Sequence, residues 1–108
     1  MLEKLKLLLG IEVIDTSLDD KLLLILSTVT ARLSLLIGGD YPPESMDHII
    51  LEVAVIRFNR IGSEGMSMHT VEGESLTFAD SDFDGFQDEI RAFLESQKEN
   101  ARGRLQFL

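Results

Sequence analysis

Apolar residues recur at spacings of three and four along residues 18–37 of this 108-residue chain. That spacing predicts a long α-helix with one buried face. A second apolar stripe lies beside the first, and it consists of Leu23, Leu26 and Leu35. A strip of small residues, where another helix could approach closely, consists of Ser27, Ala31 and Ser34. A chain of this length builds one core, so two apolar sides on one helix suggest that one of them contacts another subunit.

Turn residues and helix-cap residues predict where the other helices begin and end. A short amphipathic helix is predicted from about residue 2 to 9, closed by Gly10. Two overlapping capping boxes predict the start of the long helix, and they pair Thr16 with Asp19 and Ser17 with Asp20. After a Gly- and Pro-rich break at residues 38–43, a second long helix is predicted from Glu44 to Ile61. Its β-branched run leaves a buried strand as the alternative, but its length and its Pro and Gly brackets favour a helix.

The pattern changes after the second long helix. Residues 63–79 are predicted to form a protruding loop or β-hairpin around Glu72-Gly73-Glu74. Ser81 is predicted to cap a third helix, whose core stripe consists of Phe83, Phe86, Ile90, Phe93 and Leu94. Residues 98–108 show no helical periodicity and are predicted to be an extended tail. We therefore expect an all-α fold, with three main helices and a short N-terminal helix in one domain over residues 1–97.

The chain is acidic, with a formal net charge of −9. Residues 61–90 contain eight acidic residues and no Lys or Arg, so they lack the cationic face that binding to phosphates needs. The absence of cysteine excludes disulfides and Cys-based metal sites. The apolar fraction of 44% is high for a short soluble chain and agrees with a subunit contact, although a monomer with an ordinary core is the alternative.

The N-terminal apolar run is very short and lacks the cleavage site of a signal peptide. No stretch approaches the ~18 consecutive apolar residues of a membrane span. We therefore expect a soluble, intracellular protein that does not bind membranes.

Residues 80–85 match the first half of an EF-hand calcium loop, and the matching carboxylates are those of Asp80, Asp82 and Asp84. The twelfth position, where such a loop needs a bidentate glutamate, is Arg91. An acidic helix N-terminus, in which Ser81 and Asp84 form a capping box, is therefore favoured over a metal site. We expect no metal and no cofactor, and keep the three aspartates only as a secondary metal candidate.

No catalytic constellation is visible in the sequence. His48 and His69 fall in different predicted elements without the carboxylate spacing of a metalloprotease motif, and solvated surface histidines are favoured. The most distinctive stretch is residues 57–65, which has the features of a helix C-terminus: two arginines favourable to the helix dipole and a glycine cap.

Several of these features occur together in a known family. They are the opening segment 1–10, the Asp15-Thr16-Ser17 helix start, the Tyr41-Pro42-Pro43 break and, above all, residues 55–66, Val-Ile-Arg-Phe-Asn-Arg-Ile-Gly-Ser-Glu-Gly-Met. The third helix from Asp82 to Leu94 also agrees, so the match covers residues 1–95. In this order and spacing, the chain resembles the phage head-tail connector proteins, also called head-completion or adaptor proteins, of siphovirus-type tailed phages.

The resemblance implies a small helical bundle that assembles into a ring, expected to be dodecameric, on the portal after DNA packaging. The ring would extend the DNA channel and give the next neck component, a stopper or tail-completion protein, a docking platform. Packaged DNA would pass through without specific binding. The resemblance implies no enzyme activity, and it implies a place in the virion neck after assembly in the host cytoplasm. The rival functions are a small acidic binding protein, antitoxin- or inhibitor-like, and a calcium-binding regulatory module.

Contact surfaces are therefore the candidate sites. The expected subunit contacts are the surplus apolar residues Leu23, Leu26, Leu35, Leu51, Val55 and Phe58. The expected lining of the DNA channel consists of Glu64, Glu72 and Glu74, because carboxylates repel DNA whereas lysines and arginines would bind its phosphates. The expected contacts with the portal or a neighbouring subunit are the tail residues Lys98, Arg102, Arg104 and Phe107.

Overall fold

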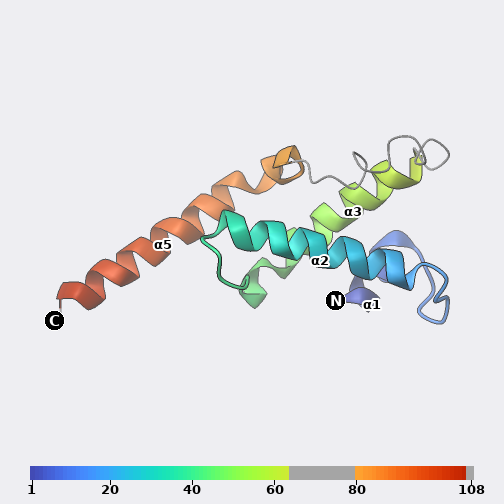
Figure 1. The fold of residues 1–108 in the computed structure, drawn as a ribbon, viewed down its shortest axis with the longest axis horizontal. Helices are drawn as coiled ribbons and strands as arrows, with labels where there is room; N and C mark the ends of the chain where they lie inside the picture. Colours follow the sequence, from blue (N-terminus) through green and yellow to red (C-terminus); the bar gives the residue numbers. More distant parts are fainter. Residues whose placement is uncertain (64–79, 107–108) are drawn as a thin grey trace.

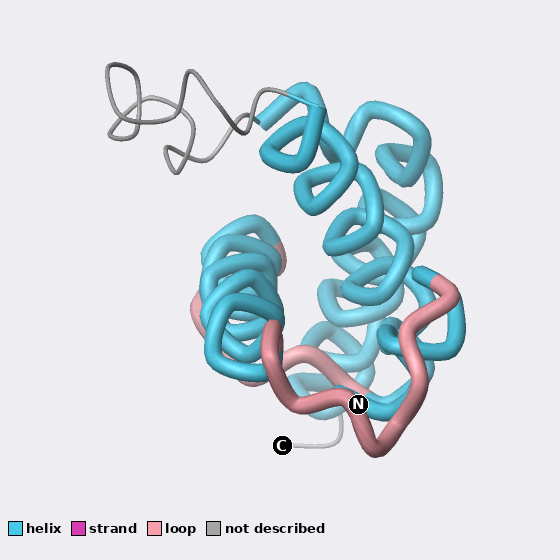
Figure 2. The backbone as a smooth tube through the Cα atoms, turned by 90° about the vertical axis from the view of Figure 1, so that its right-hand side faces the viewer, coloured by secondary structure: helices cyan, strands magenta, loops and turns pink. Residues whose placement is uncertain are grey.

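The computed structural model describes residues 1–63 and 80–106, which form helices joined by short connections (Figure 1). The α-helices are α1 (Leu2–Leu9), α2 (Asp19–Leu36), α3 (Asp47–Ser63) and α5 (Gln87–Gln106). Two 3₁₀ segments, η1 (Glu44–Met46) and η3 (Asp80–Phe86), precede α3 and α5. Figure 2 shows no strand in the described part of the chain. The all-α prediction is confirmed, and the buried-strand alternative is wrong because α3 covers the β-branched run.

The core lies where α1, α2 and α3 meet, and η3 packs against α3. The periodic stripe of α2 is buried there as predicted, with Leu22, Ile25, Val29 and Leu33. The buried hydrophobic residues of α3 are Ile49, Ile50, Val53, Ala54 and Ile61. Full burial of such a side chain contributes about 1.5–3 kcal/mol, so this contact supplies most of the bundle's stability.

Lys6 ties α1 to the start of α2. Gly10 ends α1 with φ 77°, a left-handed conformation that favours glycine. The chain then turns so that the Nζ atom of Lys6 donates to the backbone oxygens of Val13 (2.9 Å) and Asp15 (2.6 Å) and to Oδ1 of Asp19 (2.8 Å). The side chain of Lys6 is only 2% exposed. Burial of this ammonium group is tolerated because its three donors all have acceptors.

The start of α2 differs from the predicted capping boxes. Leu18 is the N-cap residue, and no side chain caps this helix end. Ser17 instead donates its backbone N–H (3.0 Å) and its hydroxyl (2.7 Å) to Oδ1 of Asp15, while Asp19 accepts from Lys6. The predicted pairs, Thr16 with Asp19 and Ser17 with Asp20, are therefore wrong. Short polar side chains can form local turns instead of caps, and here the turn is formed.

The last helix begins and ends later than predicted. Its first seven residues form η3 rather than an α-helical turn capped by Ser81, and the α-helix starts at Gln87. It then continues to Gln106, so the extended conformation predicted for residues 98–108 is wrong as far as that residue. Apart from Gly103, this segment consists of residues with ordinary or good helix propensity. A helix that is already nucleated can propagate through such residues without an apolar face.

The molecule is elongated because α5 extends beyond the other helices (Figure 1). Its radius of gyration is 16.5 Å, and its extents are 57 × 31 × 19 Å. A compact chain of this length would have a radius of gyration of about 13 Å. The predicted loop or hairpin between the second and third main helices lies outside the described residues, since residues 64–79 are not among them.

Candidate subunit interface

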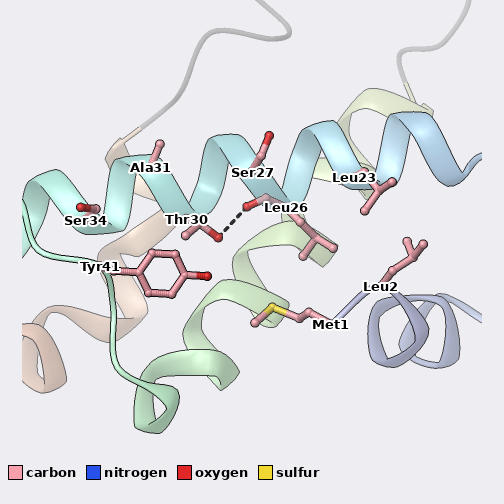
Figure 3. Close-up of a pocket in the computed structure, with 9 residues that line it drawn as sticks. All are labelled: Met1, Leu2, Leu23, Leu26, Ser27, Thr30, Ala31, Ser34 and Tyr41. Carbon is pink, nitrogen blue, oxygen red and sulfur yellow. Dashed lines mark hydrogen bonds between the residues drawn. The ribbon is translucent and has the colours of Figure 1, made fainter.

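An apolar groove of about 650 Å³ lies on the outward face of α2 (Figure 3). The start of α1 and the chain after α2 form its other walls. Its lining consists of Met1, Leu2, Leu23, Leu26, Ser27, Thr30, Ala31, Ser34 and Tyr41. The small-residue strip predicted from the sequence, Ser27, Ala31 and Ser34, is therefore part of this groove.

The hydroxyl groups in the groove have partners within the chain. Ser27 donates to the backbone oxygen of Leu24 (3.0 Å), and Thr30 donates to that of Leu26 (2.7 Å). Ser34 donates to the backbone oxygen of Asp40 (2.8 Å), which holds the Gly38–Tyr41 connection against α2. Because these polar groups are already satisfied, an apolar partner could cover them without leaving buried donors unpaired.

The outward face of α2 also lacks charge. Ten consecutive residues, Leu22 to Ala31, carry none, and Leu23 and Leu35 are 48% and 67% exposed. Tyr41, at one end of the groove, is 81% exposed. The solvent-facing side of a helix in a soluble monomer normally carries charged and polar residues. Contiguous exposed apolar surface of this kind marks an interaction site.

A second hollow of about 340 Å³ lies on α3, between the end of α1 and η3. It is lined by Leu8, Glu52, Val55, Ile56 and Phe86. Two apolar hollows formed by different elements give the subunit two distinct surfaces. Two distinct surfaces are what a head-to-tail ring contact requires.

An arginine–aspartate cluster joins the end of α3 to η3. The Nη2 atom of Arg60 lies 2.5 Å from Oδ2 of Asp82, whose side chain is 5% exposed. Arg57 is buried beside this pair. Burial lowers the pKa of the Arg57 guanidinium from its ordinary value, the charge of Asp82 opposes that shift, and the charge of Arg60 adds to it. The cluster therefore fixes the two ends of the 64–79 segment relative to each other.

The comparison with protein families agrees with this architecture. The family model of the phage gp6-like head-tail connector protein matches residues 1–93. The chain belongs to this family. No curated protein and no solved structure matches the connector. The family is a structural one of phage particles and not an enzyme family, and it places the connector between the head and the tail of a virion. Within the described residues, no helix is long and apolar enough to cross a membrane.

The structure separates the residues expected at the subunit contact into two groups. Leu23 and Leu35 are exposed on α2, and Leu23 lines the groove. Leu26 is 7% exposed and belongs to the core of the connector itself, with only an edge reaching the groove. The three residues expected from α3, Leu51, Val55 and Phe58, are partly buried against that core.

The structure describes the side chains of two of the three residues considered for a metal site. Asp82 is engaged by Arg60, Asp84 is exposed, and the side chain of Asp80 is outside the described part of the structure. In the described ranges, 1–63 and 80–106, no group of three or more His, Asp or Glu residues could hold a metal ion. His48 is exposed as expected, but its Nε2 atom lies 2.6 Å from Oε2 of Glu89, a partner 41 residues away.

The structure describes only some of the residues expected to line the channel or to contact the portal. Glu64, Glu72, Glu74 and Phe107 lie outside the described residues. Lys98 is exposed on α5, and its Nζ atom lies 3.9 Å from Oε1 of Glu95. The backbones of Arg102 and Arg104 belong to the last turns of α5. Sequence reasoning missed the link formed by Lys6 and the pairing of Asp82 with Arg60, and the signal in both cases was a charged residue next to a core position.

Proposed function

We propose that the connector is one subunit of a ring, expected to be dodecameric, that docks beneath the portal of a tailed phage. The ring extends the DNA channel and gives the next neck component, a stopper or tail-completion protein, a docking platform. The observation that supports self-assembly best is the uncharged, exposed outward face of α2. Subunits with a net charge of −9 repel one another overall, and an uncharged apolar surface of this kind allows contact without bringing like charges together.

The acidic character of the chain supports a channel that does not retain DNA. A conduit lined with lysine or arginine would bind phosphates and release counterions with every contact. Residues 61–90 contain no such residue, and they include Glu64, Glu72 and Glu74. In the proposed ring these three glutamates face the DNA, and the basic end of α5, with Lys98, Arg102 and Arg104, faces protein.

Light scattering over a concentration series, alone and with the portal protein of the same phage, tests the ring. We expect assembly in at least the portal-containing sample. Leu23→Lys should weaken it, because a charge would then have to be buried in the groove. The matched control is Leu7→Lys on α1, which is 78% exposed and does not line the groove. A chain that stays monomeric in both conditions would contradict the proposal and favour the acidic binding protein instead.

A further inference from the structure

The groove on α2 and the projecting end of α5 are two halves of one contact between copies. We infer that the second half of α5 of one subunit packs into the α2 groove of its neighbour. This inference rests on the proposed self-assembly and names the segment that fills the groove. Each copy gives one helix and receives one, which is the head-to-tail relation that closes a ring.

The floor of the groove is suited to a helix. Ser27, Ala31 and Ser34, along the α2 edge of the groove, have small side chains, which allow two helix backbones to approach closely. The flanking apolar residues, Leu23 and Tyr41, would then contact the sides of the incoming helix. An amphipathic helix in an apolar groove is a common way in which proteins recognise a helical segment.

The end of α5 has the length for this role and places two apolar residues on one face. The helix contains 20 residues, about 30 Å at 1.5 Å per residue, and its second half lies away from the other helices (Figure 1). Ala101 and Leu105 are four residues apart and so share one helical face. Ala101 is small, like the floor of the groove, so the two helices can meet there.

Charge favours the end of α5, rather than any other segment of a second copy, as the occupant of the groove. Residues 91–108 contain four basic and two acidic residues, whereas residues 1–90 have six basic and seventeen acidic ones. The end of α5 is thus the part of a neighbour that an acidic subunit attracts. One exposed carboxylate, that of Asp40, belongs to the connection that Ser34 holds at one end of the groove. Lys98 and Arg102, four residues apart on α5, are the complementary cations.

Disulfide trapping between separately labelled copies tests the inference, because the chain contains no cysteine of its own. Ala31→Cys and Ala101→Cys proteins are purified singly, mixed with portal under assembly conditions and oxidised. A disulfide forms only where Cα atoms come within about 4.4–6.8 Å, so a mixed dimer on a non-reducing gel is the expected result. The control replaces Ala101→Cys by Ala92→Cys, an exposed position on the first half of α5, and should give no mixed dimer.

Two other outcomes overturn the inference. Dimers of Ala31→Cys with itself would show that two grooves face each other. Assembly without any Ala31–Ala101 disulfide would show that α5 binds elsewhere, for example on the portal, while the ring function stands. If no assembly occurs with or without portal, the proposed function itself fails, and the inference fails with it.

A charge exchange gives a second, independent readout. Lys98→Glu with Arg102→Glu should weaken assembly, and so should Asp40→Lys. Combining the three changes should restore part of the assembly, because opposite charges then face each other again across the contact. Weakened assembly of both variants without recovery in the combination would contradict the pairing.

Discussion

At the scale of single residues, Asp82 shows how a buried carboxylate acts on its surroundings. It accepts a hydrogen bond from Arg60, and its charge opposes the effect of burial on the pKa of Arg57. The alternation of aspartates in residues 80–84 indicated a calcium loop or a helix cap, and neither describes Asp82. Its partner lies 22 residues away in the sequence, and local spacing holds no information on a pair of that kind.

Asp82→Asn should destabilise the connector by about 1–3 kcal/mol, because it removes the negative charge beside the buried Arg57 and the partly exposed Arg60. Urea denaturation followed by circular dichroism measures the effect. The matched control is Asp88→Asn, since Asp88 is fully exposed and lies 3.8 Å from Arg91 in a surface pair. Its effect should stay below about 0.5 kcal/mol. Equal effects for both variants would show that the Asp82 cluster contributes nothing specific.

The hydrogen bonds in the turn before α2 lead us to expect that one substitution, Ser17→Ala, changes the pKa of Asp15. The side-chain hydrogen bond from Ser17, and then the backbone one, hold the pKa of Asp15 below its ordinary value. Ser17→Ala removes the first of these, so the pKa of Asp15 should rise while staying below that ordinary value. NMR titration of the Asp15 carboxyl measures it. Because the folded pKa is depressed, the stabilisation is present above the unfolded pKa and disappears as pH falls through the folded pKa. The two proteins should therefore converge in stability in acid.

At the scale of elements, the sequence predicts the helices that bury an apolar stripe. The buried face of α2 was confirmed, because a period of 3.6 residues leaves a direct mark in the sequence. The end of α5 was not predicted, because a helix that projects from the fold needs no apolar period. The link between α1 and α2 was also missed, since it depends on Lys6 and on backbone oxygens that no side-chain pattern reveals.

Lys6→Met should weaken the attachment of α1 to α2. Two backbone oxygens and the carboxylate of Asp19 would lose their donor while the methionine kept most of the buried volume. We expect a loss of about 2–4 kcal/mol in the free energy of unfolding. Lys4→Met, at an exposed position of the same helix, is the control and should change little. If thermal unfolding showed the same decrease in midpoint for both variants, this account would be contradicted.

A substitution at Gly103 tests whether the end of α5 is helical. Glycine inside a helix is about 1 kcal/mol less favourable than alanine, so Gly103→Ala should raise the helicity of residues 98–106. Backbone chemical shifts of that segment are the measurement. In an extended tail, which the sequence pattern suggested, the same change would leave those shifts close to their coil values.

At the scale of the whole molecule, the acidic residues and the basic C-terminal segment occupy different parts of the chain. Acidic residues dominate the chain through residue 90, and a net positive charge is found only in residues 91–108, most of which belong to the part of α5 that extends beyond the bundle. The charge distribution is visible in the sequence, so the exclusion of phosphate binding by residues 61–90 needed no structure. The direction in which α5 leaves the bundle was not visible, because it depends on how η3 packs against α3. Both kinds of information support the proposal that the acidic residues face DNA and that the basic end of α5 faces protein.

The proposed channel lining predicts a gain of DNA retention. Glu72→Lys with Glu74→Lys should preserve folding and ring formation but make the assembled ring hold double-stranded DNA at low salt, because each lysine adds a phosphate contact and releases counterions. The retention should vanish at physiological salt, where electrostatic attraction reaches only about 8 Å. Glu3→Lys with Glu12→Lys makes the same change in net charge at two exposed positions near α1 and serves as the control. Gel-shift measurements on rings of known mass compare the two. If both variants retain DNA equally, net charge alone explains the effect, and the glutamates of the 64–79 segment do not line the channel.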